Sequence, residues 1–237
     1  MRLLIVEPIV TSPRSLEERK NYFQRAVNPG TELELVSIPR GPKSIETFYD
    51  VALAGPEILR VIQKNDQDVD AIVINCFADP ALDAAREITN KVVLGPGETS
   101  MSIALHLGAK FSVISVLPNT PYWVRMQAVK LGVASRLAAA IGVDVSVREL
   151  QEAPAQALAK LIKAAQDTVA RDQAEAIILG CTGMAPLAER VRDAVEVPVI
   201  EPAITTVKMA ELLVSLGLRH HRGTSYLPPD LSKVVGY

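Results

Sequence analysis

The chain has 237 residues, of which 49% are hydrophobic and 22% charged, a composition that is typical of a globular protein and excludes disorder as its main state. The net charge of −2 provides no basic field for a phosphate backbone, so we expect no nucleic-acid partner. The two cysteines, Cys76 and Cys181, are too few for a disulfide framework or a four-thiolate zinc site.

Short β-rich segments alternate with longer segments of helix-forming composition along the whole chain. The predicted strands cover residues 3–6, 32–37, 71–75, 92–94, 111–116, 143–148, 176–180 and 197–200. The predicted helices cover residues 15–27, 45–65, 80–89, 99–107, 121–140, 154–171, 187–194 and 205–216. Several strands are continuously apolar, which indicates burial on both faces of a parallel sheet. The alternation therefore predicts an α/β fold.

No targeting or membrane segment is visible in the sequence. The apolar run at residues 3–6 is far shorter than the core of a signal peptide. The longest apolar stretches also fall short of the roughly 20 residues that a membrane span needs. We therefore expect a cytoplasmic protein without a membrane partner.

The two halves of the chain resemble each other. Residues 70–78 can be laid over residues 175–183 at an offset of 105, which places Cys76 over Cys181 (181 − 76). Residues 93–100 match 199–206 at an offset of 106, and residues 2–6 match 110–114 more loosely. We infer two pseudo-symmetric lobes, each a parallel sheet flanked by helices, with the active site in the cleft between them. The predicted first lobe comprises residues 1–97 and about 207–237, and the second comprises residues 98–206.

Each cysteine follows a predicted buried strand and precedes a predicted helix. Ligands bind at the carboxyl ends of parallel strands, and a helix N-terminus lowers the pKa of a nearby thiol. Two such thiols facing each other across a cleft suit racemisation, because one removes the α-proton while the other delivers a proton to the opposite face. Burial of both cysteines as packing residues is the alternative interpretation.

At these residues the sequence resembles the aspartate/glutamate/hydantoin racemase superfamily, and its hydantoin and allantoin racemase branch in particular. The segments that carry the resemblance are Asn-Cys-Phe-Ala-Asp-Pro-Ala-Leu-Asp-Ala-Ala-Arg-Glu at 75–87, Gly-Pro-Gly-Glu at 95–98 and Leu-Gly-Cys-Thr-Gly-Met at 179–184. The resemblance covers the chain to about residue 218. It implies catalysis by the cysteine pair, no metal, no pyridoxal cofactor and a homo-oligomer. The implied substrate is a 5-substituted hydantoin or a related ureide.

Further residues are candidates for contacting the substrate. Donors for an enolate oxygen are expected from the backbone and hydroxyl groups that flank the cysteines or follow strands. Asp79 is interpreted as a cap of the helix after Cys76, with Pro80 at its first position. The candidate substrate-binding residues are Glu7, Pro8, Asn75, Phe77, Ala78, Glu98, Thr99, Thr120, Thr182, Gly183 and Met184.

One position departs from the family pattern. Hydantoin racemases commonly have Asn-Pro-Asn-Thr-Ser after the first strand, whereas this chain has Glu7-Pro8-Ile9-Val10-Thr11-Ser12. A carboxylate at position 7 would repel an acidic substrate and could accept hydrogen bonds from imide or ureide N–H groups. A solvated carboxylate at the end of a strand is the alternative interpretation.

Other functions remain open at this point. An aspartate or glutamate racemase, or a maleate-type isomerase, would need cationic groups for carboxylate recognition, and neither cysteine loop contains an arginine. A ligand-binding protein that keeps the two-lobed cleft without turnover is the third possibility.

Overall fold

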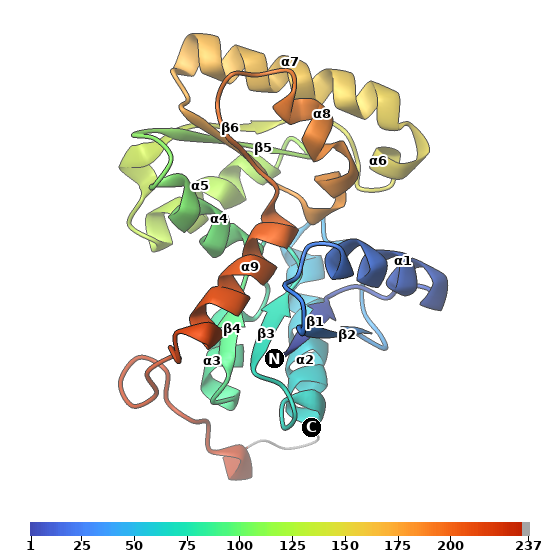
Figure 1. The fold of residues 1–237 in the computed structure, drawn as a ribbon, viewed down its shortest axis with the longest axis vertical. Helices are drawn as coiled ribbons and strands as arrows, with labels where there is room; N and C mark the ends of the chain where they lie inside the picture. Colours follow the sequence, from blue (N-terminus) through green and yellow to red (C-terminus); the bar gives the residue numbers. More distant parts are fainter. Residues whose placement is uncertain (234–237) are drawn as a thin grey trace.

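Continuously apolar runs form the centres of two parallel sheets in the computed structural model, which describes residues 1–233 (Figure 1). The first sheet has the order β2-β1-β3-β4 and the second the order β6-β5-β7-β8. The strands of the first sheet are β1 (Arg2–Glu7), β2 (Glu32–Ser37), β3 (Ala71–Ile74) and β4 (Val92–Leu94). Those of the second are β5 (Phe111–Ser115), β6 (Leu137–Gly142), β7 (Ala176–Leu179) and β8 (Val199–Ile200). The predicted α/β fold with two similar parallel sheets is confirmed.

Helices connect the strands and cover the sheets. The first half contains α1 (Pro13–Gln24), α2 (Phe48–Asn65), α3 (Leu82–Ile88) and α4 (Pro96–Ala104). The second half contains α5 (Thr120–Lys130), α6 (Glu149–Glu152), α7 (Pro154–Asp172), α8 (Ala188–Arg192) and α9 (Pro202–Ser215). Short 3-10 turns are η1 (Ala134–Arg136), η2 (Thr182–Leu187) and η3 (Leu231–Lys233). In the described part of the chain, no helix has the length and apolar character to cross a membrane.

Helices α4 and α9 cross between the two sheets. Helix α4 follows β4 of the first sheet, yet its Met101 packs with Phe111 and Ile178 of the second sheet. Helix α9 follows β8 of the second sheet, yet its Val207 packs with Ile5 of the first. The two helices also pack against each other (Figure 1). The lobe boundaries after residues 97 and 206 stay predictions, since each crossover helix belongs by sequence to one half and packs on the other.

The prediction was wrong at residues 121–148. A single helix was expected over 121–140, but α5 ends at Lys130 and Leu137–Gly142 forms β6 at the edge of the second sheet. Gly132, with a φ of +73°, allows the chain to turn after the helix. The alanines of β6 favour a helix intrinsically, and pairing with β5 overrides that preference. The expected strand 143–148 is instead the loop that follows β6.

The segment after α9 returns to the first sheet. His220 Nε2 accepts a hydrogen bond from the N–H of Val93 in β4 (2.8 Å). The buried Arg86 of α3 donates to the hydroxyl of Tyr226 (3.1 Å) and to the carboxylate of Glu98 (2.8 Å). This segment therefore packs against β4, the edge strand of the first sheet.

Candidate active site

The two cysteines occupy equivalent positions at the carboxyl ends of β3 and β7. The residue before Cys76 donates its N–H to the carbonyl of Val6 in β1 (2.9 Å), and the residue before Cys181 donates its N–H to the carbonyl of Ile114 in β5 (2.7 Å). Both thiols are free and half-buried within the described residues. The equivalence that the sequence repeat predicts is therefore present in the backbone of the two sheets.

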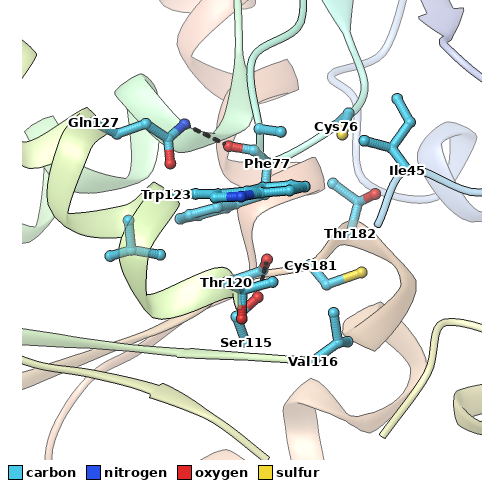
Figure 2. Close-up of a pocket in the computed structure, with 13 residues that line it drawn as sticks. Ile45, Cys76, Phe77, Ser115, Val116, Thr120, Trp123, Gln127, Cys181 and Thr182 are labelled. Atoms are coloured by element: carbon cyan, nitrogen blue, oxygen red, sulfur yellow. Dashed lines mark hydrogen bonds between the residues drawn. The ribbon is translucent and has the colours of Figure 1, made fainter. Parts of the chain in front are cut away.

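A cavity of about 50 Å³ lies between the two cysteines (Figure 2). Figure 2 shows Cys76 and Cys181 on opposite sides of it, with Ile45 and Thr182 beside them. The lining consists of Ile45, Cys76, Phe77, Ala78, Ser115, Val116, Thr120, Trp123, Val124, Gln127, Gly180, Cys181 and Thr182. Both halves of the chain contribute to this lining.

Four predicted substrate-binding residues line this cavity, namely Phe77, Ala78, Thr120 and Thr182. Sequence reasoning missed Ile45, Ser115, Val116, Trp123, Val124, Gln127 and Gly180. Ser115 and Val116 lie at the carboxyl end of β5, and Ile45 lies in the loop after β2. The rule that ligands bind at the carboxyl ends of parallel strands could have identified these three. Trp123, Val124 and Gln127 lie within α5, where no comparable sequence signal exists.

The hydroxyl groups in the lining already donate their protons to backbone carbonyls. Thr120 Oγ1 donates to the carbonyl of Leu117 (2.5 Å), and Ser115 Oγ donates to the carbonyl of Gly180 (2.9 Å). Because a carbonyl oxygen can only accept, each hydroxyl proton is committed. These two side chains therefore offer lone pairs, and not donors, to a ligand.

A second cavity of about 220 Å³ adjoins the first, since Thr182 belongs to both linings. It is lined by Ser15, Glu18, Arg19, Tyr22, Phe23, Asn75, Thr182, Gly183, Ala185, Pro186 and Ala203. The predicted site residues Asn75 and Gly183 lie here. Asn75 and Arg19 therefore lie in a cavity next to the one between the sulfurs.

Glu7 is buried behind Asn75 and belongs to neither lining. Its Oε1 accepts a hydrogen bond from Asn75 Nδ2 (2.7 Å), and its Oε2 forms an ion pair with Arg19 (2.9 Å). Burial raises the pKa of Glu7, while the charge of Arg19 and the two hydrogen bonds act in the opposite direction. The carboxylate is thus paired inside the protein and is not a solvated strand-end group.

Four other predicted residues lie outside both cavities. Pro8 follows β1, and Thr99 is buried within α4. Glu98 pairs with Arg86, and Met184 is fully buried in the core of the second lobe. None of these four residues belongs to the lining of either cavity.

Asp79 connects the Cys76 loop to α4. The interpretation of Asp79 as the cap of the helix after Cys76 was wrong, because its carboxylate accepts from the N–H groups of Gly97 (2.9 Å) and Glu98 (2.7 Å) at the start of α4. Gln127 of α5 donates to the carbonyl of Phe77 (2.7 Å) in the same loop. Burial raises the pKa of Asp79 to about 7. The loop is therefore held from two helices.

The loop between β2 and α2 covers the cavity from the side of Ile45. The backbone carbonyl of Glu46 accepts from Asn119 Nδ2 (2.8 Å), and its carboxylate accepts from the N–H of Val147 (3.1 Å). Both partners belong to the second half of the chain. Phe48, at the start of α2, packs on Trp123 with a ring-centre distance of 4.9 Å.

The surroundings of the two thiols determine what they can do. Burial raises the pKa of both thiols. Two backbone N–H groups, of Gly183 and Met184, and the charge of Arg19 act against this at Cys181. Opposed thiols of this kind can exchange a proton with the two faces of one carbon atom.

Comparisons with known proteins identify the family of the chain. Residues 3–210 match the family described as Asp/Glu/Hydantoin racemase. A hydantoin racemase of Pseudomonas sp. (strain NS671) is 33% identical over the whole chain and 95% of its own length. An allantoin racemase structure from Klebsiella pneumoniae is 33% identical (TM-score 0.90, 97% of this chain and 94% of that one). Another from Pseudomonas fluorescens is 30% identical (TM-score 0.94, all of both chains). The chain therefore belongs to the Asp/Glu/Hydantoin racemase family and is an isomerase of the racemase type.

Proposed function

We propose that this racemase uses a two-base mechanism without a cofactor, in which Cys76 and Cys181 act on opposite faces of the substrate carbon. The proposed substrate is a 5-substituted hydantoin or a related ureide. The observation that carries the mechanism is the placement of the thiols at equivalent strand ends on opposite sides of one cavity. The relatives named hydantoin racemase and allantoin racemase support the substrate class.

The reaction follows from the two thiols and the ring carbon between them. The thiolate of one cysteine takes the proton from carbon 5, and the electron pair of the broken C–H bond moves onto the neighbouring carbonyl oxygen. The thiol of the other cysteine then gives its proton to the opposite face of carbon 5 and is left as a thiolate. The enantiomer formed is the product, and the cysteines exchange roles in the reverse direction.

The enolate oxygen requires donors. Thr120 and Ser115 have committed their hydroxyl protons, so the backbone N–H groups of the cysteine loops are the groups that we expect to stabilise the enolate. At Cys181 these belong to the start of the turn η2, where the N–H of Met184 already donates to the carbonyl of Cys181 (3.0 Å), so the groups we expect to act are those of Thr182 and Gly183. Because the backbone already holds these N–H groups in place, they need not reorient as negative charge develops on the oxygen.

The hydrogen-bonding character of the cavity supports a ureide over an amino acid. Thr120 and Ser115 present acceptors, which match the N–H groups of a hydantoin ring and oppose a carboxylate. Arg19, the cation of the second cavity, is already paired with Glu7. A dicarboxylate would thus meet more acceptors than free donors in this part of the chain.

The test uses one enantiomer of 5-benzylhydantoin and of 5-isopropylhydantoin, with wild type, Cys76→Ser and Cys181→Ser. We expect each substitution to reduce racemisation by about 10²- to 10⁴-fold, the range for loss of a positioned acid or base. Each variant should retain hydrogen exchange at carbon 5 with only one enantiomer. Racemisation by both variants at the wild-type rate would contradict the mechanism. Aspartate and glutamate serve as control substrates, and faster turnover of either would contradict the substrate class.

A further inference from the structure

Glu7 controls how the side-chain amide of Asn75 is oriented. Glu7 is 1% exposed, and its ion pair with Arg19 at 2.9 Å favours the charged carboxylate, which can only accept hydrogen bonds. While Glu7 is ionised, the group of Asn75 that faces it is the NH₂, in agreement with the 2.7 Å contact from Nδ2 to Oε1. The charge of Glu7 thus determines the orientation of the Asn75 amide.

The other end of this amide is left without a partner. Asn75 is 5% exposed and lines the 220 Å³ cavity. Among the described residues, none forms a hydrogen bond with its Oδ1, although the atom is buried. A buried carbonyl oxygen without a donor destabilises a protein. A ligand that brings an N–H to this atom therefore forms a hydrogen bond that no described residue provides, and this bond favours binding.

The second lobe has no counterpart to this group. By strand register, Ser115 is equivalent to Glu7 and Gly180 is equivalent to Asn75. Ser115 bonds to the backbone carbonyl of Gly180, which has no side chain to offer. A side-chain amide acceptor beside the cysteine pair is therefore a feature of the first lobe alone, whereas the second lobe offers the hydroxyl lone pairs of Ser115 and Thr120. This difference gives the ligand a defined orientation between the lobes.

We propose that Glu7, held by Arg19, is a positioning residue that fixes the orientation of the Asn75 side-chain amide. In this orientation Asn75 Oδ1 accepts a hydrogen bond from an N–H of the ligand. The same oxygen disfavours a ligand carboxylate at this position. The ligand identity rests on the proposed function, whereas the orientation of the amide does not. Glu7 thus acts through Asn75 and not by direct contact with the substrate.

The substitution Glu7→Gln gives a defined structural outcome. Arg19 can only donate, so it holds the carbonyl oxygen of the new amide and turns its NH₂ toward Asn75. The Asn75 amide must then invert and present its own NH₂ to the cavity. In the matched control Glu7→Gln/Arg19→Met, nothing holds the new amide, and either orientation of Asn75 becomes possible.

The binding test compares two ligands with the same substituent: a 5-substituted hydantoin and the corresponding N-carbamoyl amino acid, in which the ring is opened to a carboxylate. We measure KM and kcat for the hydantoin and the inhibition constant of the carboxylate. Glu7→Gln should shift the preference from hydantoin toward carboxylate by at least about tenfold, mainly in KM, and the double variant should shift it less. An unchanged preference would overturn the proposal, as would an equal weakening of both ligands, which a purely structural role predicts.

A second measurement needs no ligand. In protein labelled with ¹⁵N at asparagine, the Asn75 NH₂ should exchange slowly with solvent in wild type, because it is bonded to the buried Glu7. In Glu7→Gln it should exchange faster, because it faces the cavity. Equal exchange in both proteins would overturn the proposal whatever the ligands do. If wild type does not racemise hydantoins but the amide behaves as described, the proposed substrate fails and the positioning role stands.

Discussion

The two thiols differ in the charges and N–H groups around them. Cys76 has the backbone N–H of Ala78 nearby, but the negative charges of Asp79 and Glu7 add to burial in raising its pKa. Burial and the negative charge of Glu46 raise the pKa of Cys181, whereas the N–H group of Gly183, the charge of Arg19 and the N–H group of Met184 act in the opposite direction. Cys181 is therefore the thiol that we expect to ionise first.

This difference predicts the order of alkylation. Iodoacetamide should modify Cys181 several-fold faster than Cys76 near neutral pH, since each unit of pKa changes the thiolate fraction about tenfold. Because both pKa values are raised, both rates should increase as the pH rises from about 7 to about 9. Peptide mapping by mass spectrometry gives the two rates, and the single Cys→Ser variants identify each site. Faster modification of Cys76 would contradict this assignment.

At the scale of elements, Asp79 connects a catalytic loop to a helix. Its carboxylate is buried at the start of α4, where it accepts two backbone N–H groups. The ordinary pKa of aspartate, 3.8, rises to about 7 in the folded protein because burial opposes the charged form. The folded state therefore binds a proton here at a pH where the unfolded chain has lost it.

The sign of the resulting pH dependence follows from this proton. Between about pH 5 and pH 7, the Asp79 contribution to the free energy of unfolding should fall as the pH rises, by at most about 1.4 kcal/mol per pH unit. Above the folded pKa the contribution becomes constant. Urea unfolding at several pH values should show this slope in wild type and a shallower slope in Asp79→Asn. Equal slopes in the two proteins would show that Asp79 does not titrate in this way.

Much of the architecture could be predicted because the strands are continuously apolar and repeat at one offset. Cys76 and Cys181 could be paired from sequence because each follows such a strand. Tertiary effects account for what was missed. Residues 137–142 have a helical composition, and only pairing with β5 makes them a strand. Arg19 lies on a mostly polar helix, and its ion pair with Glu7 depends on how α1 packs against the first sheet.

At the scale of the whole molecule, contacts between the two lobes enclose the site. The loop that carries Ile45 and Glu46 comes from the first half of the chain and is held by Asn119 and Val147 of the second. Phe48 and Trp123 pack across the same boundary. We therefore expect these contacts to hold the loop over a ligand that lies between the cysteines.

Loss of the Asn119 contact tests this enclosure. Asn119→Ala and Asn119→Asp both remove the donor to the carbonyl of Glu46, and we expect KM to rise by about two- to tenfold, the value of one hydrogen bond. The melting temperature should change little, since the contact is exposed. Steady-state kinetics and thermal unfolding give both quantities. An unchanged KM in both variants would mean that this loop does not cover the substrate.

The central claim is that two different sulfurs serve the two faces of one carbon, and deuterium incorporation by the wild-type protein tests it most directly. One enantiomer of 5-benzylhydantoin is incubated in D₂O with the protein. Early in the reaction the two enantiomers are separated, and the deuterium content of each is measured by mass spectrometry. We expect the product to carry deuterium and the remaining substrate to carry almost none, because the proton delivered comes from a second thiol already exchanged with solvent. Product that retains the original hydrogen, or equal deuterium in both enantiomers from the start, would indicate a single base and contradict the two-thiol mechanism.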